Sequence, residues 1–178
     1  MKKATVLRWV FIFLLISCGT IVADVNVDWD RQADFSHFKT YAWGKGTPAK
    51  NPLMDQRIVE AIDKNMAAKG LQKVEDPSAA DLIVIYHAAV GTQTELNTTN
   101  MGGGWGWRWG GTGMSTTTVD KIPTGQLVVD IGDAKSKKLL WMGNASDTLS
   151  DKPEKNTEKI NKAVNKMFEK FPPPVKKS

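Results

Sequence analysis

The sequence is poor in the residues that most often carry metal or redox chemistry. Its 178 residues include one cysteine and two histidines. A single cysteine, Cys18, excludes an intrachain disulfide and any metal site built from a cysteine cluster. The histidines, His37 and His87, do not stand at the spacings from acidic residues that are typical of metal sites. We therefore expect neither a metal ion nor a cofactor.

Motifs for covalent catalysis and for phosphate binding are missing as well. The glycine-rich segment 102–111 lacks the Lys-Ser/Thr pair of a phosphate loop. Four serines lie outside any nucleophile-elbow pattern: Ser115, Ser136, Ser146 and Ser150. We therefore name no catalytic residue and favour a non-enzymatic protein. An enzyme with an unrecognised acid/base site is the alternative, which a pocket gathering His87 with two carboxylates would favour.

A strong charge excess is absent once the first 23 residues are set aside. The formal net charge is +5, but three of the 24 basic side chains are Lys2, Lys3 and Arg8, which leaves 21 basic against 19 acidic residues. The excess that remains lies in residues 152–178, where a lysine-rich helix face is expected to be solvated. We do not expect nucleic-acid binding.

Residues 1–23 have the pattern of a signal peptide. Three positive charges precede the apolar run 9–16, which is too short for a stable membrane-spanning helix. Leu15-Ile16-Ser17-Cys18 then resembles the bacterial lipobox, whose cysteine is lipidated and becomes the new N-terminus. Gly19 after the cysteine resembles the pattern of outer-membrane sorting. The alternative is secretory cleavage after Ala23, which would remove Cys18 and yield a soluble periplasmic or secreted protein.

Residues 24–171 are expected to form a single α+β domain. Period-2 alternation predicts strands at 25–30 and in the hairpin 125–146, whose two strands flank a polar turn at 133–138. Residues 39–43 are expected to form a short strand, and the β-branched run 82–86, apolar on both faces, predicts a central strand. Apolar residues at helical spacing predict one helix after Asn51 and a second after Asp151, where Glu154 suggests a capping box. The pattern predicts an antiparallel-rich sheet of about five or six strands, with two amphipathic helices packed mainly on one face, and a disordered tail at 172–178.

A Gly/Trp-rich loop at 97–114 interrupts the pattern of strands. So many glycines make ordering costly, and we expect the surrounding Thr/Asn/Gly segment 92–118 to be a mobile loop. In an extended stretch Trp105, Trp107 and Trp109 would project to one side and Arg108 to the other. These four are the candidate binding residues. A loop folded back over the edge of the core is the structural alternative.

Several segments resemble a bacterial envelope lipoprotein family catalogued as domain of unknown function 4136. They are Val27-Asp28-Trp29-Asp30, Phe38-Lys39-Thr40-Tyr41-Ala42-Trp43, Ala80-Asp81-Leu82 and residues 125–143, in the order of the family. The resemblance implies a secreted or lipid-anchored α+β domain and no known activity. It does not extend to the Trp/Gly loop.

These observations favour a non-enzymatic cell-envelope protein that binds or scaffolds through the Trp/Gly-rich loop. We expect lipid attachment at Cys18 and, through it, a membrane as partner. Another envelope protein or a glycan is the expected ligand of the loop. A carbohydrate-binding module that uses Trp105, Trp107 and Trp109 as a stacking strip is the main alternative.

Overall fold

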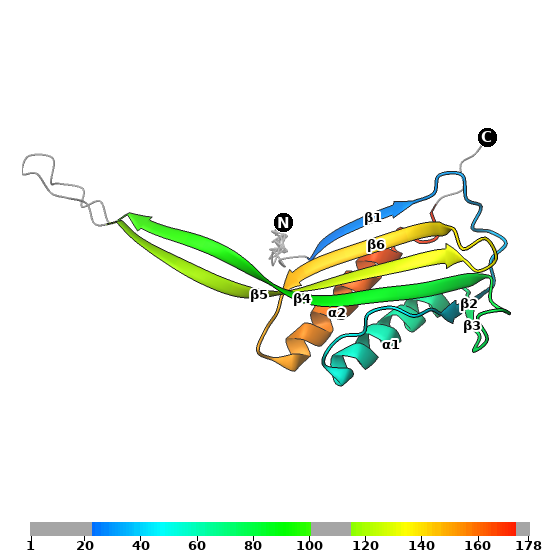
Figure 1. Ribbon diagram of the computed structural model, residues 1–178, viewed down its shortest axis with the longest axis horizontal. Coiled ribbons are helices and arrows are strands. Elements are labelled where there is room, and N and C mark those ends of the chain that lie inside the picture. Colours follow the sequence, from blue (N-terminus) through cyan, green and yellow to red (C-terminus); the bar gives the residue numbers. More distant parts are fainter. Residues whose placement is uncertain (1–22, 101–114, 174–178) are drawn as a thin grey trace, which may run out of the picture.

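The computed structural model describes residues 23–100 and 115–173, which form one six-stranded sheet and two helices. The elements in chain order are β1 (Asp24–Trp29), β2 (Thr40–Trp43), α1 (Pro52–Ala68), β3 (Gln72–Lys73), β4 (Leu82–Asn100), β5 (Ser115–Asp133), β6 (Leu139–Thr148) and α2 (Pro153–Phe168). Both helices lie side by side on the same face of the sheet (Figure 1). The predicted α+β class is confirmed.

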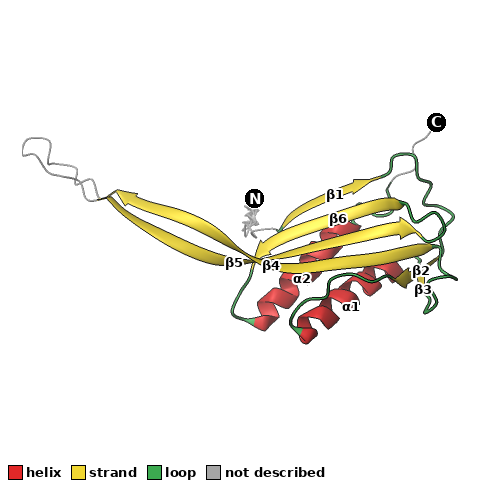
Figure 2. Cartoon of the chain, in the orientation of Figure 1, coloured by secondary structure: helices red, strands yellow, loops and turns green. Residues whose placement is uncertain are grey.

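The sheet is mixed rather than purely antiparallel. Its strand order is β1-β6-β5-β4-β2-β3, and β2 runs parallel to both β4 and β3. The parallel pairing of β2 with β4 arises because α1 connects them, and such a crossover returns the chain in the same direction. The other neighbouring pairs, β1–β6, β6–β5 and β5–β4, are antiparallel. Figure 2 shows the two layers of helices and strands.

The predicted hairpin at 125–146 is confirmed as the centre of this sheet. Leu127, Val129 and Ile131 of β5 alternate toward the helices, and Val129 and Ile131 are fully buried. At the turn, the Asp133 carboxylate accepts hydrogen bonds from the backbone N–H groups of Lys135 and Ser136. These bonds close the chain before β6 begins.

Helix α1 begins and ends at the residues that its sequence predicts. The Asn51 side chain accepts hydrogen bonds from the N–H groups of Leu53 and Met54, and Pro52 occupies the first turn. Gly70 follows the helix at a φ of 83°, a left-handed conformation that costs glycine little.

The start of α2 differs from the prediction. Its N-cap residue is Lys152, which makes no side-chain capping bond, so the capping box expected from Asp151 and Glu154 is wrong. Asn156 closes this end of the helix instead. Its side chain accepts from the N–H of Ser150 at 2.8 Å and donates to the Ser150 carbonyl at 2.7 Å. A pattern of two residues three apart cannot reveal this longer return contact.

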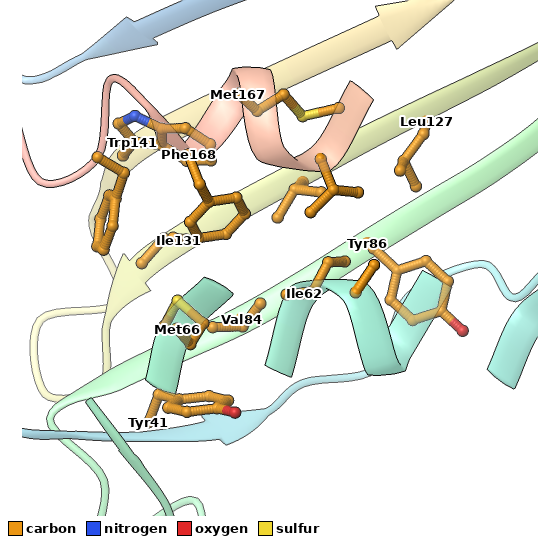
Figure 3. Packing of buried hydrophobic residues seen from close by; sticks show 14 of the residues in the cluster. Tyr41, Ile62, Met66, Val84, Tyr86, Leu127, Ile131, Trp141, Met167 and Phe168 are labelled. Atoms are coloured by element: carbon orange, nitrogen blue, oxygen red, sulfur yellow. The ribbon is translucent and has the colours of Figure 1, made fainter. Parts of the chain in front are cut away.

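A cluster of aromatic rings joins α2 to the sheet. Trp141 of β6 is fully buried and lies beside Phe168 of α2 (Figure 3). Its ring centroid is 5.4 Å from those of Phe168 and Phe171. Gly143 allows this packing, since a Cβ there would lie 2.6 Å from Trp141 and 2.9 Å from the Met167 sulfur. Phe35 then extends the cluster by an edge contact with Phe171. The predicted packing of α2 on the sheet is confirmed, and Phe35 and Phe38 of the loop before β2 are buried as well.

Strands β4 and β5 are far longer than the helices that cover them. Each strand has 19 residues, which at ~3.4 Å per residue span about 64 Å. The helices have 17 and 16 residues and reach only about 25 Å at 1.5 Å per residue. The strands therefore continue beyond the helices as a two-stranded projection, which Figure 1 shows leaving the body of the domain.

Removal of the Phe168 ring tests the packing of α2. Phe168→Ala should lower the free energy of unfolding by about 3–5 kcal/mol, because the ring is only 1% exposed and its loss leaves a cavity beside Trp141. Leu53→Ala in α1 is the matched control, because Leu53 is 62% exposed and its loss should cost about 0.5 kcal/mol or less. Urea denaturation measures both. A cost below about 1 kcal/mol for Phe168→Ala would contradict the packing.

Candidate functional site

The projecting ends of β4 and β5, residues 91–100 and 115–123, form an antiparallel ribbon that we call the arm. The two strands stay in register from Gly91 opposite Thr124 to Asn100 opposite Ser115. Among the described residues, β4 has no other neighbour beyond the bridge between His87 and Thr47, and β5 pairs with β6 only from Thr124 onward. Two-stranded ribbons are marginal in water on their own. The arm therefore presents two open strand edges.

Apolar side chains continue along one face of the arm. Alternation places Val90, directly before the arm, and Leu96 of the arm on the face that carries the buried Val84. Val119 of β5 lies opposite Leu96. No helix covers these residues, and their side chains are 66%, 67% and 54% exposed in the order Val90, Leu96, Val119. The arm thus offers apolar surface next to open backbone edges.

The arm corrects the prediction of a mobile loop at 92–118. Residues 92–100 belong to β4 and 115–118 to β5, so the loop expected at 97–114 loses its first four residues to a strand. Thr-rich segments favour strands, and pairing between the two flanks outweighed the polar composition that suggested a loop.

None of the predicted site residues lies within the described part of the chain. Trp105, Trp107, Arg108 and Trp109 lie outside the described residues, within the segment 101–114 that joins the two arm strands. Cys18 also lies outside the described residues, as does the tail from residue 174. These predictions remain predictions.

An apolar cleft with a volume of about 340 Å³ opens where the arm leaves the body. A row of apolar side chains across the sheet, two of them alanines, forms its floor: Ala88 of β4 faces Leu127 of β5, which in turn faces Ala145 of β6. Met54 and Ile58 of α1, with Ile160 and Ala163 of α2, form its walls. This cleft was not predicted from the sequence. A usable signal was the presence of alanines, Ala88 and Ala145, at strand positions that follow large side chains.

Polar contacts hold the walls of the cleft in place. The Asp55 carboxylate accepts hydrogen bonds from the Tyr86 hydroxyl at 2.6 Å and from the Ala49 N–H at 2.7 Å, so α1, β4 and the loop before α1 are joined. Burial raises the pKa of the Tyr86 hydroxyl, and the hydrogen bond to Asp55 raises it further. These bonds leave the Ala49 side chain facing the cleft that it lines.

Charged side chains stand only at the rim of the cleft. Lys159 of α2 donates to the Asp147 carboxylate at 3.0 Å and to the Thr148 carbonyl at 2.7 Å. Lys50 also lines the rim, is exposed, and has no ion pair among the described residues. The cleft therefore combines an apolar interior with an entrance that carries two ammonium groups and one carboxylate.

His87 does not gather the acid/base groups of a recognisable active site. Its Nδ1 atom lies 2.9 Å from the Thr47 hydroxyl. Burial raises the pKa of the nearby Asp130 carboxyl, and the charge of His87 opposes that shift. Neither His87 nor Asp130 lines the cleft. Among the described residues, no group of three or more His, Cys, Asp or Glu side chains is placed to hold a metal ion.

Asp81 joins two of the segments on which the family resemblance was based. Its carboxylate accepts hydrogen bonds from the N–H groups of Lys39 at 2.9 Å and Thr40 at 3.0 Å, and from the Thr40 hydroxyl. The backbone N–H groups of Lys39 and Thr40 hold the pKa of Asp81 below its usual value. Asp81 therefore fixes the start of β2 beside β4, which is a structural role.

Neither helix in the described residues has the length and apolar character needed to cross a bilayer. No curated protein matches the chain. A family model described as "Domain of unknown function (DUF4136)" matches residues 25–173.

Two solved structures share the fold. The chain is 18% identical to a PDZ domain protein from Parabacteroides distasonis, with a TM-score of 0.56. The match covers 85% of this chain and 36% of that protein. It thus spans about a third of that relative. A DUF4136 family protein from Bacteroides thetaiotaomicron is also 18% identical, with a TM-score of 0.51 over 84% of this chain and 96% of the other. At this identity the likeness concerns the fold alone.

Loss of the Asp81 carboxylate should destabilise the domain in a pH-dependent way. Asp81→Ala should cost about 1–2 kcal/mol at pH 7, because it leaves two N–H donors without their acceptor at a partly exposed site. The folded-state pKa is lowered, so the carboxylate stabilises fully above the unfolded pKa of about 3.9, and this contribution is lost as the pH falls toward the folded pKa.

Thermal melts between pH 7 and pH 2.5 measure this effect. The difference in melting temperature between the wild type and Asp81→Ala should shrink below about pH 4. Asp151→Ala, at an exposed position, is the control and should melt like the wild type. A difference that is constant across this pH range would show that the charge of Asp81 contributes nothing.

Proposed function

The chain belongs to the DUF4136 family of domains of unknown function, and from this premise we propose that it is a non-enzymatic binding or scaffolding protein of the bacterial cell envelope. The observation that carries the proposal is the arm. A ribbon with open edges and exposed apolar side chains is a poor element of stability but a suitable contact surface for a partner.

The proposed location is the outer membrane, with the domain facing the periplasm. The leader pattern and the lipobox-like Leu15-Ile16-Ser17-Cys18 support acylation of Cys18. Ala23, five residues later, is buried against the core, so the folded domain begins close to the proposed anchor. A soluble periplasmic or secreted form, cleaved after Ala23, is the alternative.

The proposed contact residues are those at the end of the arm. The segment 101–114 connects the two strands of the arm, and Ser115, the first residue of β5, lies nine residues before Thr124, where the pairing of β5 with β6 ends. Trp105, Trp107 and Trp109 supply large apolar surface, and Arg108 favours anionic headgroups or acidic sugars. Another envelope protein and a glycan are therefore both candidate ligands.

Mass spectrometry of the mature N-terminus tests the anchor. We expect an acylated Cys18 as the first residue, because a thiol directly after the apolar run matches the lipobox pattern. Replacement of Cys18 by Ser should abolish acylation and release the protein from the membrane fraction. A native chain that begins at Asp24 would contradict the anchor.

Replacement of Trp105, Trp107 and Trp109 by Ala tests the arm as a binding element. If the three indoles form a contact surface, the melting temperature should stay within about 2 °C of the wild type, because an exposed residue contributes little to stability. Capture of envelope protein, glycan or anionic vesicles should fall strongly. Trp141→Ala is the matched control, since this buried indole should cost about 3–5 kcal/mol.

The readouts separate the candidate ligands. Loss of glycan binding alone would identify a carbohydrate-binding module, whereas loss of vesicle binding alone would identify a contact with the membrane. Strong destabilisation of the triple variant without a change in binding would end the proposal that the arm binds through its indoles.

A further inference from the structure

The apolar cleft exists because the row of the sheet next to the arm contains two alanines, Ala88 and Ala145, on either side of Leu127. Successive rows on the helix-covered face contain Ile131 beside Trp141, then Val129 beside Gly143, then Leu127 beside Ala145. Trp141 fills the first row and packs on α2. Ala145 at the third row fills much less space, and the cleft begins there. The cleft is thus part of the packing of the domain rather than a feature of one loop.

The interior of the cleft has the character of a site for a hydrocarbon chain. The side chains named above for the floor and walls are apolar, and they come from the sheet and both helices. Five uncharged polar residues also line the cleft: Asn51, Gln126, Ser146, Thr148 and Asn156. The volume of about 340 Å³ lies within the range of ~300–1,000 Å³ that is typical of small-molecule sites. A polar ligand would find no partner for its hydrogen bonds on that floor, so desolvation would oppose its binding.

The entrance adds a preference for an acidic head group. Lys50 is exposed and has no ion-pair partner among the described residues, and Lys159 of α2 lies beside Asp147. The side chain of Lys159 is 33% exposed, so part of its charge is accessible. Two ammonium groups against one carboxylate leave a positive excess, which favours a carboxylate or a phosphate at the entrance over a neutral head group.

The position of the cleft places it near the proposed anchor. Ala23, the first described residue, lines the cleft. Five residues span at most about 18 Å, so Ala23 cannot lie farther than this from Cys18. If Cys18 is acylated, the entrance lies close to the lipid surface. This step rests on the proposed function, whereas the apolar lining and the charges at the rim do not.

We propose that the cleft binds one fatty-acyl chain of a molecule with an acidic head group. The chain lies between α1, α2 and the row Ala88, Leu127 and Ala145, and the head group remains at the rim beside Lys50 and Lys159. A free long-chain fatty acid and an anionic phospholipid share this chemistry. The arm begins immediately beyond Val90 and Gly125, which both line the cleft.

Titration with palmitate tests the cleft directly. A chain that starts at Gly19 retains every described residue and has no acyl group of its own, so it avoids the need for detergent. We expect saturable binding of one palmitate per chain. Hexadecanol, which has the same hydrocarbon length and a neutral head, should bind more weakly.

Two cavity-filling variants locate the bound chain. Ala49→Trp fills the cleft from the loop before α1, and Ala88→Phe fills it from the floor; each should weaken palmitate binding at least tenfold. Ala33→Trp is the matched control, because Ala33 is also a half-buried loop alanine but does not line the cleft. Circular dichroism and thermal melts identify the variants that remain folded.

Charge variants at the rim test the head group. Lys50→Glu should weaken palmitate binding severalfold and leave hexadecanol binding unchanged, whereas Lys45→Glu, outside the cleft, should change neither. Incubation with vesicles of phosphatidylglycerol and phosphatidylcholine, followed by mass spectrometry of the re-isolated protein, distinguishes the sources. One phosphatidylglycerol per chain identifies a membrane phospholipid, and palmitate binding without lipid uptake identifies a free fatty acid.

The proposal that the cleft binds a fatty-acyl chain and the proposal that Cys18 is acylated can be refuted independently. Absence of saturable palmitate and phospholipid binding, or unchanged binding by folded Ala49→Trp and Ala88→Phe, overturns the proposed cleft even if Cys18 is acylated. A mature chain that starts at Asp24 overturns the anchor, while one-to-one binding that both filling variants abolish still supports the cleft.

Discussion

The structure depends on a mismatch in length between its two layers. Strands β4 and β5 are 19 residues long, and helices of 17 and 16 residues can cover less than half of that distance. The aromatic cluster around Trp141 fixes α2 at the far end of the sheet, so the uncovered part must lie at the other end. The arm and the cleft are both consequences of where the helices stop.

The two ends of the domain consequently differ in their packing. At one end Trp141, Phe168 and Phe171 fill the space between sheet and helix, and Asp81 joins β2 to β4. At the other end alanines replace large side chains and leave a cleft of about 340 Å³. The first end supplies the stability of the fold. The second end, which includes the first described residue of the chain, is free to carry binding surfaces.

The proposed anchor, cleft and arm therefore belong to one end of the molecule. Ala23 lines the cleft, and the strands that form its floor continue directly into the arm. An occupant of the cleft would contact Val90 and Gly125, where the arm leaves the sheet. If Cys18 is acylated, as we propose, contact at the membrane and contact through the arm would both act on this end of the domain.

Local patterns in the sequence determined most of the elements: the Asn51 cap, Gly70, the hairpin at 125–146 and the apolar stripe of α2 each have a short-range physical cause. They could not reveal the parallel pairing of β2, the Asn156–Ser150 closure or the true length of β4 and β5, because each depends on contacts between distant segments. The cleft likewise depends on contacts between segments that are distant in the sequence. Ala88, Leu127 and Ala145 are unremarkable in their own strands, and only the register of the sheet, set by tertiary packing, places them in one row beneath two helices.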